Sequence, residues 1–434
     1  MKEKAFTETL LSLAGFEEMT KTAEKSSGLI SVTGCIDAQK SQMIYAFGGH
    51  RKNKLIVTFG EQKAKELYDE YSFFDKEVVY YPSKDVLFYQ SDIRGNLLTA
   101  ERIRALKAIR EQERVTLVTT FDALMNTMAP IEKMWENVLT LEQGQLLDLK
   151  EIQAALIRMG YEKEYQVQTM GQFSVRGGIL DVFPLTEENP IRIELWGDEI
   201  DTIRYFDCES QKSIENIDRV SIYPAAELVL SDEEKAGGIE KLKAEAKRVS
   251  DKLRKQMKTE EAHRVTVMAD ELTEEWGELS MYAGMDAFLS YFFDERVGLL
   301  DYFKPSDSLI FFDELTRCVE QGKLTETEFS ESMKQRLAMG YILPGQMNGL
   351  FTEKEIVAKL EKYSCIALGA LDNKANGLHQ LGSYGIHCQS VSPYNNSFEL
   401  LIKDLKRYKK NGYRVILLSG SRTRAKRLSE DICL

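Results

Sequence analysis

The sequence has little of the cysteine and histidine chemistry on which many small sites depend. Its six cysteines are spread over 434 residues without a C-x-x-C pair, and it has only four histidines. This spacing offers neither a disulfide framework nor a zinc site. It favours a reducing environment, and we expect a cytoplasmic protein.

Long apolar segments are also missing. No apolar run approaches the ~20 residues that cross a bilayer as a helix. Residues 1–19 predict a short, acidic amphipathic helix and lack the apolar core of a signal peptide. We therefore expect no membrane partner.

Basic residues are outnumbered by acidic ones. The sequence has 57 Lys and Arg and 69 Asp and Glu, which gives a formal net charge of −12. A protein that mainly binds nucleic acid needs clustered Lys and Arg to neutralise phosphates. Two basic stretches exist, at 243–258 and 403–414, and we interpret both as solvated helix faces. The balance argues against a protein whose main task is nucleic-acid binding.

What the sequence does have is an alternation of apolar strands with helical stretches. Strand-like runs lie at 29–33, 54–59, 77–81 and 115–120. This order predicts an α/β fold with a doubly wound parallel sheet. The chain then becomes rich in short strands and turns, which predicts a small antiparallel β (α+β) domain inserted into the first.

The loop after the first strand, at residues 31–42, is close to the Walker A pattern G-x-x-x-x-G-K-[ST]. Gly34, Lys40 and Ser41 stand in register, but the second glycine is replaced by Gln39. In a working loop the backbone N–H groups hold the phosphates, the lysine reaches the β and γ oxygens, and the hydroxyl binds Mg²⁺. Lys40 and Ser41 could still do both jobs.

A possible second half of that site lies at Asp313 and Glu314, which end the buried run 308–312 where a Walker B motif places its acids. Three features argue against ATP use. Gln39 puts a side chain where glycine lets the backbone approach phosphate, and Asp37 adds negative charge to the loop. The arginine motif Q-x-x-G-R-x-x-R, whose arginines can contribute ~10³ or more in rate, is absent from the sequence.

We therefore predict a vestigial nucleotide site, with no catalytic residue, metal or cofactor in this chain. Its members are Gly34, Gln39, Lys40, Ser41, Asp313 and Glu314. The alternative is an active ATPase or helicase lobe that binds Mg-ATP through Lys40, Ser41, Asp313 and Glu314.

The domain boundaries follow from these patterns. Residues 1–127 and 228–352 form the two parts of a degenerate RecA-like domain, 128–227 form the inserted β domain, and 353–434 form a small further C-terminal α/β domain. Because the last expected helix runs to the end, we expect the chain to be a piece of a longer protein.

The inserted domain has strands that alternate between apolar and polar residues. Ile191, Ile193 and Leu195 face one way, and Arg192, Glu194 and Trp196 the other. In the same manner Phe173 and Val175 are expected to point inward, and Gln172, Ser174 and Arg176 outward. Gly177-Gly178 predicts a bulge or tight bend and residues 196–199 a hairpin turn. Arginine and tryptophan are frequent at interface hot spots, but they could equally form surface ion pairs worth ~0–1 kcal/mol.

Several motifs resemble a known family. "GQFSVRGGILDVFP", "IRIELWGDEIDTIRYFD" and "IYPAAE" resemble the domain shared by the excinuclease subunit UvrB and the bacterial transcription-repair coupling factor Mfd. "LLDYFKPSDSLIFFDE" and "MGYILPG" resemble the UvrB-like core of both, and residues 398–428 look like the next domain of the coupling factor. The altered loop, and the stretch 81–106 that leaves no room for UvrB's DNA-threading hairpin, favour the N-terminal module of the coupling factor.

The resemblance implies a module that has given up ATP use and recruits UvrA through its inserted domain. By motif, the UvrA-contacting positions are Arg176, Arg192 and Trp196, with Glu194 beside them, although family members often carry phenylalanine at the position of Trp196. The longer protein would be an ATP-dependent DNA translocase that binds RNA polymerase and double-stranded DNA. Its ATP and Mg²⁺ would belong to a C-terminal motor, and its far C-terminal domain would cover the UvrA-binding surface in the resting protein.

Overall fold

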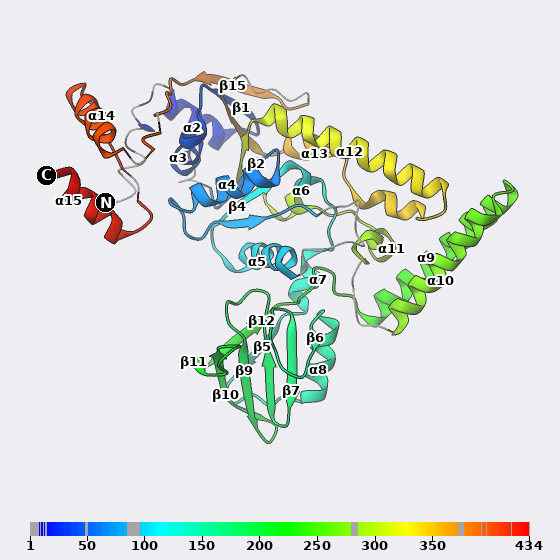
Figure 1. Ribbon diagram of the computed structural model, residues 1–434. Helices are drawn as coiled ribbons and strands as arrows, with labels where there is room; N and C mark the ends of the chain where they lie inside the picture. The colour runs from blue at the N-terminus through cyan, green and yellow to red at the C-terminus, as the bar shows by residue number, and fades with distance from the viewer. Residues whose placement is uncertain are drawn as a thin grey trace.

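The computed structural model describes residues 15–47, 51–84, 96–278, 285–371 and 377–433, apart from 392, 396 and 418, together with residues 8, 10, 11 and 13. Figure 1 shows an α/β body, a small β domain below it, a long helical hairpin that projects to one side, and two helices set apart near the C-terminus. Part of the helix expected at 1–19, and residues 85–95 where UvrB's hairpin would lie, are outside the described residues.

The α/β body is built on a parallel sheet of seven strands in the order β15-β1-β14-β13-β2-β4-β3. The central strands are buried along almost their whole length because helices cover both faces of the sheet. The predicted doubly wound α/β fold is confirmed. The strands are β1 (Gly28–Thr33), β2 (Asn53–Thr58), β3 (Val79–Tyr81), β4 (Val115–Thr120), β13 (Ser308–Asp313), β14 (Ser364–Gly369) and β15 (Gln380–Gly385).

Two apolar layers sandwich this sheet, since successive side chains of each strand point to opposite faces. One layer includes Phe47, Leu67 and Phe311 and packs under helices α2 (Phe16–Lys25), α3 (Asp37–Phe47) and α4 (Glu61–Tyr71). The other includes Ile103 and Phe312. Its helices are α5 (Asn96–Glu111), α6 (Phe121–Met125), α12 (Leu315–Ala338) and α13 (Glu353–Leu360).

The boundary predicted at residue 353 needs correction. β14 lies between β1 and β13, and β15 pairs with β1, so these strands complete the first sheet instead of starting a new domain. The strand expected within 413–420 is not formed in the part of that segment that is described. Val415, Ile416 and Leu417 there are exposed, and no strand within the described residues pairs with them. The described elements of this region are helices α14 (Phe398–Lys410) and α15 (Arg422–Cys433).

The inserted domain is a six-stranded sheet in the order β11-β10-β9-β8-β7-β6, antiparallel except for the β6–β7 pair. Its strands are β6 (Glu162–Lys163), β7 (Gln172–Arg176), β8 (Ile179–Val182), β9 (Ile191–Trp196), β10 (Glu199–Phe206) and β11 (Ser213–Ile217). The predicted bend at Gly177-Gly178 and the hairpin turn at 197–198 are confirmed, with Gly177 at φ 61° and Gly197 at φ 65°.

One face of this six-stranded sheet packs against α8 (Leu149–Arg158), and a second small sheet pairs β5 (Leu139–Glu142) with β12 (Arg219–Ile222). The chain enters the insert through α7 (Ile131–Glu136). It leaves through Glu227, whose carboxylate accepts hydrogen bonds from Arg102 Nε (2.7 Å) and Nη2 (3.0 Å). Burial opposes ionisation of Glu227, but Arg102 and Lys84 outweigh it and lower the pKa to about 2. This buried charge pair fixes the exit of the insert on α5.

The helical hairpin follows the insert and consists of α9 (Asp232–Lys255) and α10 (Thr259–Glu278), with the short α11 (Leu289–Phe292) at its base. Among the described residues, no helix is both long enough and apolar enough to cross a membrane.

Candidate functional site

The loop that resembles Walker A is closed by the protein's own backbone. Gly34 adopts φ 79°, and a Cβ added to it would lie 2.1 Å from the carbonyl oxygen of Ile386. The N–H of Gly34 donates to Ala370 O (3.2 Å) and that of Cys35 to Gly369 O (3.1 Å). Helix α3 already begins at Asp37, three residues before Lys40. Two backbone donors that would face a phosphate in a P-loop are therefore spent on the end of β14, and Ile386, just after β15, donates its own N–H to Thr33 O (2.9 Å).

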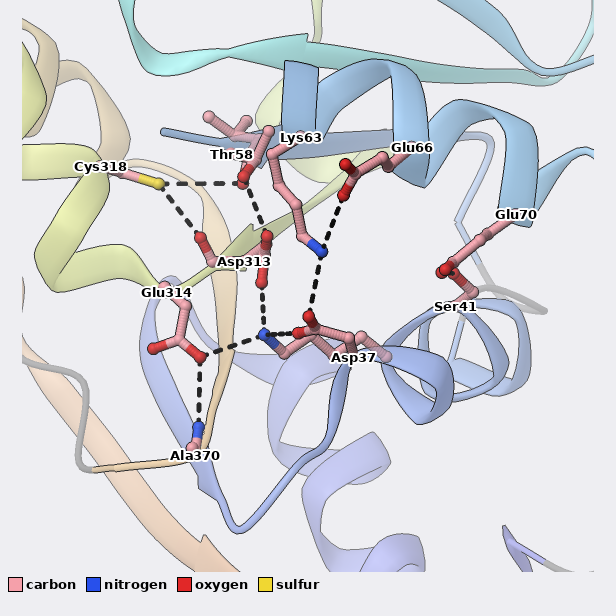
Figure 2. Close-up of polar contacts among 12 residues, drawn as sticks. Asp37, Ser41, Thr58, Lys63, Glu66, Glu70, Asp313, Glu314, Cys318 and Ala370 are labelled. Atoms are coloured by element: carbon pink, nitrogen blue, oxygen red, sulfur yellow. Dashed lines mark hydrogen bonds and ion pairs between the residues drawn. The ribbon is translucent and has the colours of Figure 1, made fainter. Parts of the chain in front are cut away.

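The side chain of Lys40 is 2% exposed and lies among three carboxylates. Its Nζ is 2.5 Å from Asp313 Oδ1, 3.0 Å from Asp37 Oδ1 and 3.1 Å from Glu314 Oε1. Figure 2 shows these carboxylates converging from α3 and from the end of β13. Burial disfavours the charged ammonium, but the charge and hydrogen bond of Asp313 outweigh it and raise the pKa of Lys40 above its ordinary value.

The surrounding side chains complete this cluster. The second oxygen of Asp313 accepts from Thr58 Oγ1 (2.9 Å), and Glu314 accepts from the N–H of Ala370 (3.2 Å). Asp37 also accepts from Lys63 Nζ (3.1 Å). Burial raises the pKa of Asp37, but the hydrogen bonds from Lys40 and Lys63 together lower it below its usual value. The positive charge of Lys40 is thus compensated by carboxylates of the chain itself.

Ser41 and Gln39 point elsewhere. The Ser41 hydroxyl is 3.4 Å from Glu70 Oε2 on α4, and Gln39 Oε1 accepts from Cys388 Sγ (2.5 Å). The structure therefore brings together Lys40, Asp313 and Glu314, but turns Ser41 towards another helix. Within the described ranges, no group of His, Cys, Asp and Glu side chains is arranged to hold a metal ion.

A second polar cluster covers the outward face of the inserted sheet. Asp181 on β8 is 1% exposed and lies directly opposite Arg192 on β9. Arg192 donates from Nε to Asp181 Oδ1 (2.7 Å) and from Nη2 to Oδ2 (2.8 Å), while Arg176 Nη2 on β7 donates to the same Oδ2 (2.8 Å). The buried carboxylate of Asp181 thus pairs with both Arg176 and Arg192, the two arginines that the sequence predicts as partner-binding residues.

The two arginines differ in accessibility. Arg192 is 12% exposed, donates also to Gln211 Oε1 (2.8 Å) and stacks 4.4 Å from the centre of the Phe206 ring. Hydrogen bonding to Asp181 raises its pKa. Arg176 is 37% exposed and uses one of its nitrogens on Asp181. Arg192 therefore acts as an internal brace, and Arg176 keeps donors available to a partner.

The remaining predicted residues lie along the same face. Glu194 accepts from Arg204 Nη2 (2.5 Å) and Nη1 (2.8 Å), and this pairing lowers the pKa of Glu194. Trp196 is 85% exposed at the end of β9, where it borders an open hollow of about 640 Å³ lined also by Glu142, Glu199, Asp201 and Arg219. Ser174 lies on the outward face as expected, since it pairs opposite Asp181, but it is not exposed, because its hydroxyl donates to Tyr165 O (2.8 Å) and its side chain is buried.

Sequence reasoning missed Asp181, Thr58, Lys63 and Glu70. Asp181 was detectable, because pairing β8 with β9 across alternating strands places it opposite Arg192. The other three come from strands and helices whose contacts with the loop have no local signal.

The comparisons with known proteins agree with this architecture. A family model described as the UvrB interaction domain matches residues 139–228, which contain both sheets of the insert. The transcription-repair-coupling factor of Bacillus subtilis (strain 168) is 27% identical over 376 residues, covering 86% of this chain and 31% of the relative. That of Staphylococcus haemolyticus is 26% identical over 409 residues, covering 92% of this chain and 34% of the relative.

These matches show which class of protein module the chain contains and which family of proteins it resembles. The chain is a UvrB-like module that carries a UvrB interaction domain. It corresponds to the N-terminal UvrB-like module of the transcription-repair-coupling factors, Mfd, which confirms the predicted resemblance. The chain spans about a third of the length of these relatives.

The Lys40 cluster predicts a loss of stability on mutation. In Lys40→Met the 2%-exposed Asp313 loses its cation, and breaking a buried ion pair in this way costs roughly 3–5 kcal/mol. Lys63→Met is the matched control, since it removes a lysine that pairs with the largely exposed Asp37. We expect urea unfolding to show a large loss for the first variant and less than about 1 kcal/mol for the second. Equal stability of the two variants would contradict a structural role for Lys40.

The Asp181 cluster predicts unequal effects of its two arginines. Arg192→Ala leaves a buried carboxylate with a single hydrogen bond, so we expect a loss of roughly 3 kcal/mol or more. Arg176→Ala leaves the two bonds from Arg192 in place and removes a partly exposed pair, worth ~0–1 kcal/mol. Thermal melting of the two variants tests this order, and a lower melting temperature for Arg176→Ala would reverse our assignment.

Proposed function

We propose that this chain is a catalytically silent adaptor that recruits UvrA through the outward face of its inserted domain. The observation that carries the proposal is the exposed pair Arg176 and Trp196, presented on neighbouring parts of the region that matches the UvrB interaction domain. An arginine with free donors suits a carboxylate of the partner, since charge-assisted hydrogen bonds are the stronger ones. An exposed tryptophan supplies the apolar area of a hot spot.

The charges around Lys40 support the proposal that this chain makes no use of a nucleotide. A bound triphosphate would have to displace Asp37, Asp313 and Glu314 from the ammonium group and then lie beside them. Like charges at ~4 Å repel by roughly 4 kcal/mol at an effective dielectric constant of about 20. The carboxylates that surround Lys40 thus take the place that the phosphates of a nucleotide would occupy.

Further partners belong to the longer protein from which such a module would come. We propose that the whole protein is cytoplasmic, works as an ATP-dependent DNA translocase with ATP and Mg²⁺ in its motor, and contacts RNA polymerase and double-stranded DNA. We also propose that its far C-terminal domain covers the UvrA-binding face at rest, so that this chain alone exposes that face.

The alternative is an active ATPase lobe, favoured by the meeting of Lys40 with Asp313 and Glu314 at the sheet edge where α/β folds bind ligands. A ligand at a hundred times its dissociation constant stabilises a fold by about 2.7 kcal/mol. We expect no change in melting temperature with saturating Mg-ATP, either for the parent or for Gln39→Gly, because the Lys40 cluster persists in both. A rise for the parent supports the ATPase, and a rise only for Gln39→Gly makes Gln39 the decisive residue.

Recruitment is tested by calorimetric titration with UvrA. Because Arg192 is a brace, the informative variants are Arg176→Ala and Trp196→Ala, with Arg158→Ala as control on α8, which packs against the opposite face. We expect Arg176→Ala and Trp196→Ala each to weaken binding roughly 30-fold, about 2 kcal/mol, and the control to bind as the parent does. Absence of binding by the folded parent overturns the proposed partner, whereas unchanged binding by both variants relocates the surface.

A further inference from the structure

The helical hairpin of α9 and α10 carries a concentration of positive charge around its tip, at residues 241–264, that the adaptor function does not use. It projects from the α/β body, away from the inserted domain (Figure 1). Towards its tip, six exposed side chains form no ion pair or hydrogen bond with any described residue. They are Lys243, Lys247, Lys252, Arg254, Lys255 and Lys258. We call this set the hairpin cations.

The hairpin is a packed arm with a defined position. Leu242 and Leu253 on α9 meet Ala262 and Val265 on α10, and Ser250 Oγ donates to Ala262 O (3.1 Å). The segment that follows α12 braces the tip, since a Cβ on Gly340 would lie 2.6 Å from Glu261 O and Arg264 lies 4.9 Å from the centre of the Tyr341 ring. The packing of α9 on α10, together with the contacts of Gly340 and Tyr341, therefore holds the backbone that carries the hairpin cations in a defined position.

Ordinary helix electrostatics explain only part of this charge. Lys252, Arg254 and Lys255 stand in the last turn of α9, where cations interact favourably with the helix dipole. Lys243 and Lys247 lie further back at i,i+4 spacing, where like charges repel by ~0.2–0.5 kcal/mol. Glu245, one of two acids between 241 and 258, also accepts the hydroxyl proton of Tyr291 and the N–H of Gly345 (3.1 Å). Glu260 and Glu261 also lie at the tip, but residues 241–264 hold nine Lys and Arg against four Asp and Glu, so this part of the arm keeps net positive charge.

The net charge of −12 does not cancel this local field. Salt screens exposed charges beyond about 8 Å at physiological ionic strength. The hairpin cations are consequently screened from those acidic groups of the body that lie farther away than this, and a polyanion that reaches the outward side of the arm meets the cations first. The negative total charge of the chain therefore does not argue against nucleic-acid binding at this part of the surface.

We propose that the hairpin cations form a docking surface for the phosphate backbone of duplex nucleic acid, independent of the UvrA-binding face. Phosphate contacts are made largely by Lys and Arg and need no apolar hot spot, whereas protein interfaces are depleted in Lys and rich in aromatic residues. Between 241 and 258 the tip offers Met257 but no aromatic side chain, and the nearby exposed Tyr341 is stacked on Arg264. From Lys243 to Lys255 the helix spans about 18 Å, a length over which a duplex carries roughly ten charges.

The test uses the whole chain and a fluorescein-labelled DNA duplex of about three helical turns, with binding followed by anisotropy as salt is raised. The hairpin variant carries Lys243→Gln, Lys247→Gln, Lys252→Gln and Lys255→Gln. The matched control carries Lys403→Gln, Lys406→Gln, Lys409→Gln and Lys410→Gln on α14, which removes the same charge from another basic helix. For four phosphates neutralised, affinity of the parent should fall roughly 10²-fold between 50 and 200 mM salt.

We expect the hairpin variant to bind at least about tenfold more weakly at low salt and with a shallower salt dependence, and the control to bind as the parent does. Binding of UvrA should be unchanged in the hairpin variant, which separates this proposal from the previous one. No binding by the parent at low salt, or equal weakening of both variants, overturns it. Poly-L-glutamate that competes as well as DNA, charge for charge, also overturns it and assigns the surface to an acidic polypeptide.

Discussion

The buried ammonium group of Lys40 is the interaction around which the α/β body is organised. It joins the first turn of α3 to the end of β13 and, through Glu314, to the backbone beyond β14. This is the carboxyl edge of the sheet, where open α/β folds bind their ligands. Here the protein supplies both signs of charge itself, and Gly34 allows the backbone at Ile386 to lie where a phosphate would otherwise approach. The edge is consequently closed by packing, and the charge of Lys40 needs no ligand to compensate it.

The inserted domain also contains a buried carboxylate that pairs with cations, but there one of the cations stays accessible to a partner. Asp181 is as buried as Asp313, and each carboxylate holds a long cation. At the sheet edge, Lys40 is the described lysine that pairs with Asp313, and this lysine is itself buried with its donors used on Asp37, Asp313 and Glu314. On the insert, one arginine is enclosed and the other reaches the surface of the sheet that also carries the exposed Trp196. The capacity to bind thus lies on the insert, although both clusters are built from paired charges.

The order in which the chain passes through the α/β body and the insert keeps the carboxyl edge of the sheet independent of the inserted domain. The insert leaves the body after β4 and returns at Glu227, which the buried Arg102 holds on α5. Neither crossing interrupts the parallel sheet, because its next strand, β13, is added beside β2 after the hairpin. The hairpin projects from this same return segment. Recognition surfaces can therefore differ in charge and chemistry without disturbing the closed edge.

Local patterns in the sequence were enough to determine the alternating α/β elements, the turns at Gly177 and Gly197, the outward position of Arg176 and Trp196, and the altered loop at Gln39. These features depend on periodicity and on backbone conformation, which neighbouring residues set. Other features required the tertiary structure. Lys40 and Asp313 are 273 positions apart, and β14 enters between β1 and β13 from far along the chain. Which arginine is a brace and which is free depends on burial of Asp181, and the isolation of the hairpin cations depends on where the arm points. Such contacts arise from packing between distant segments, for which a single sequence carries no local signal.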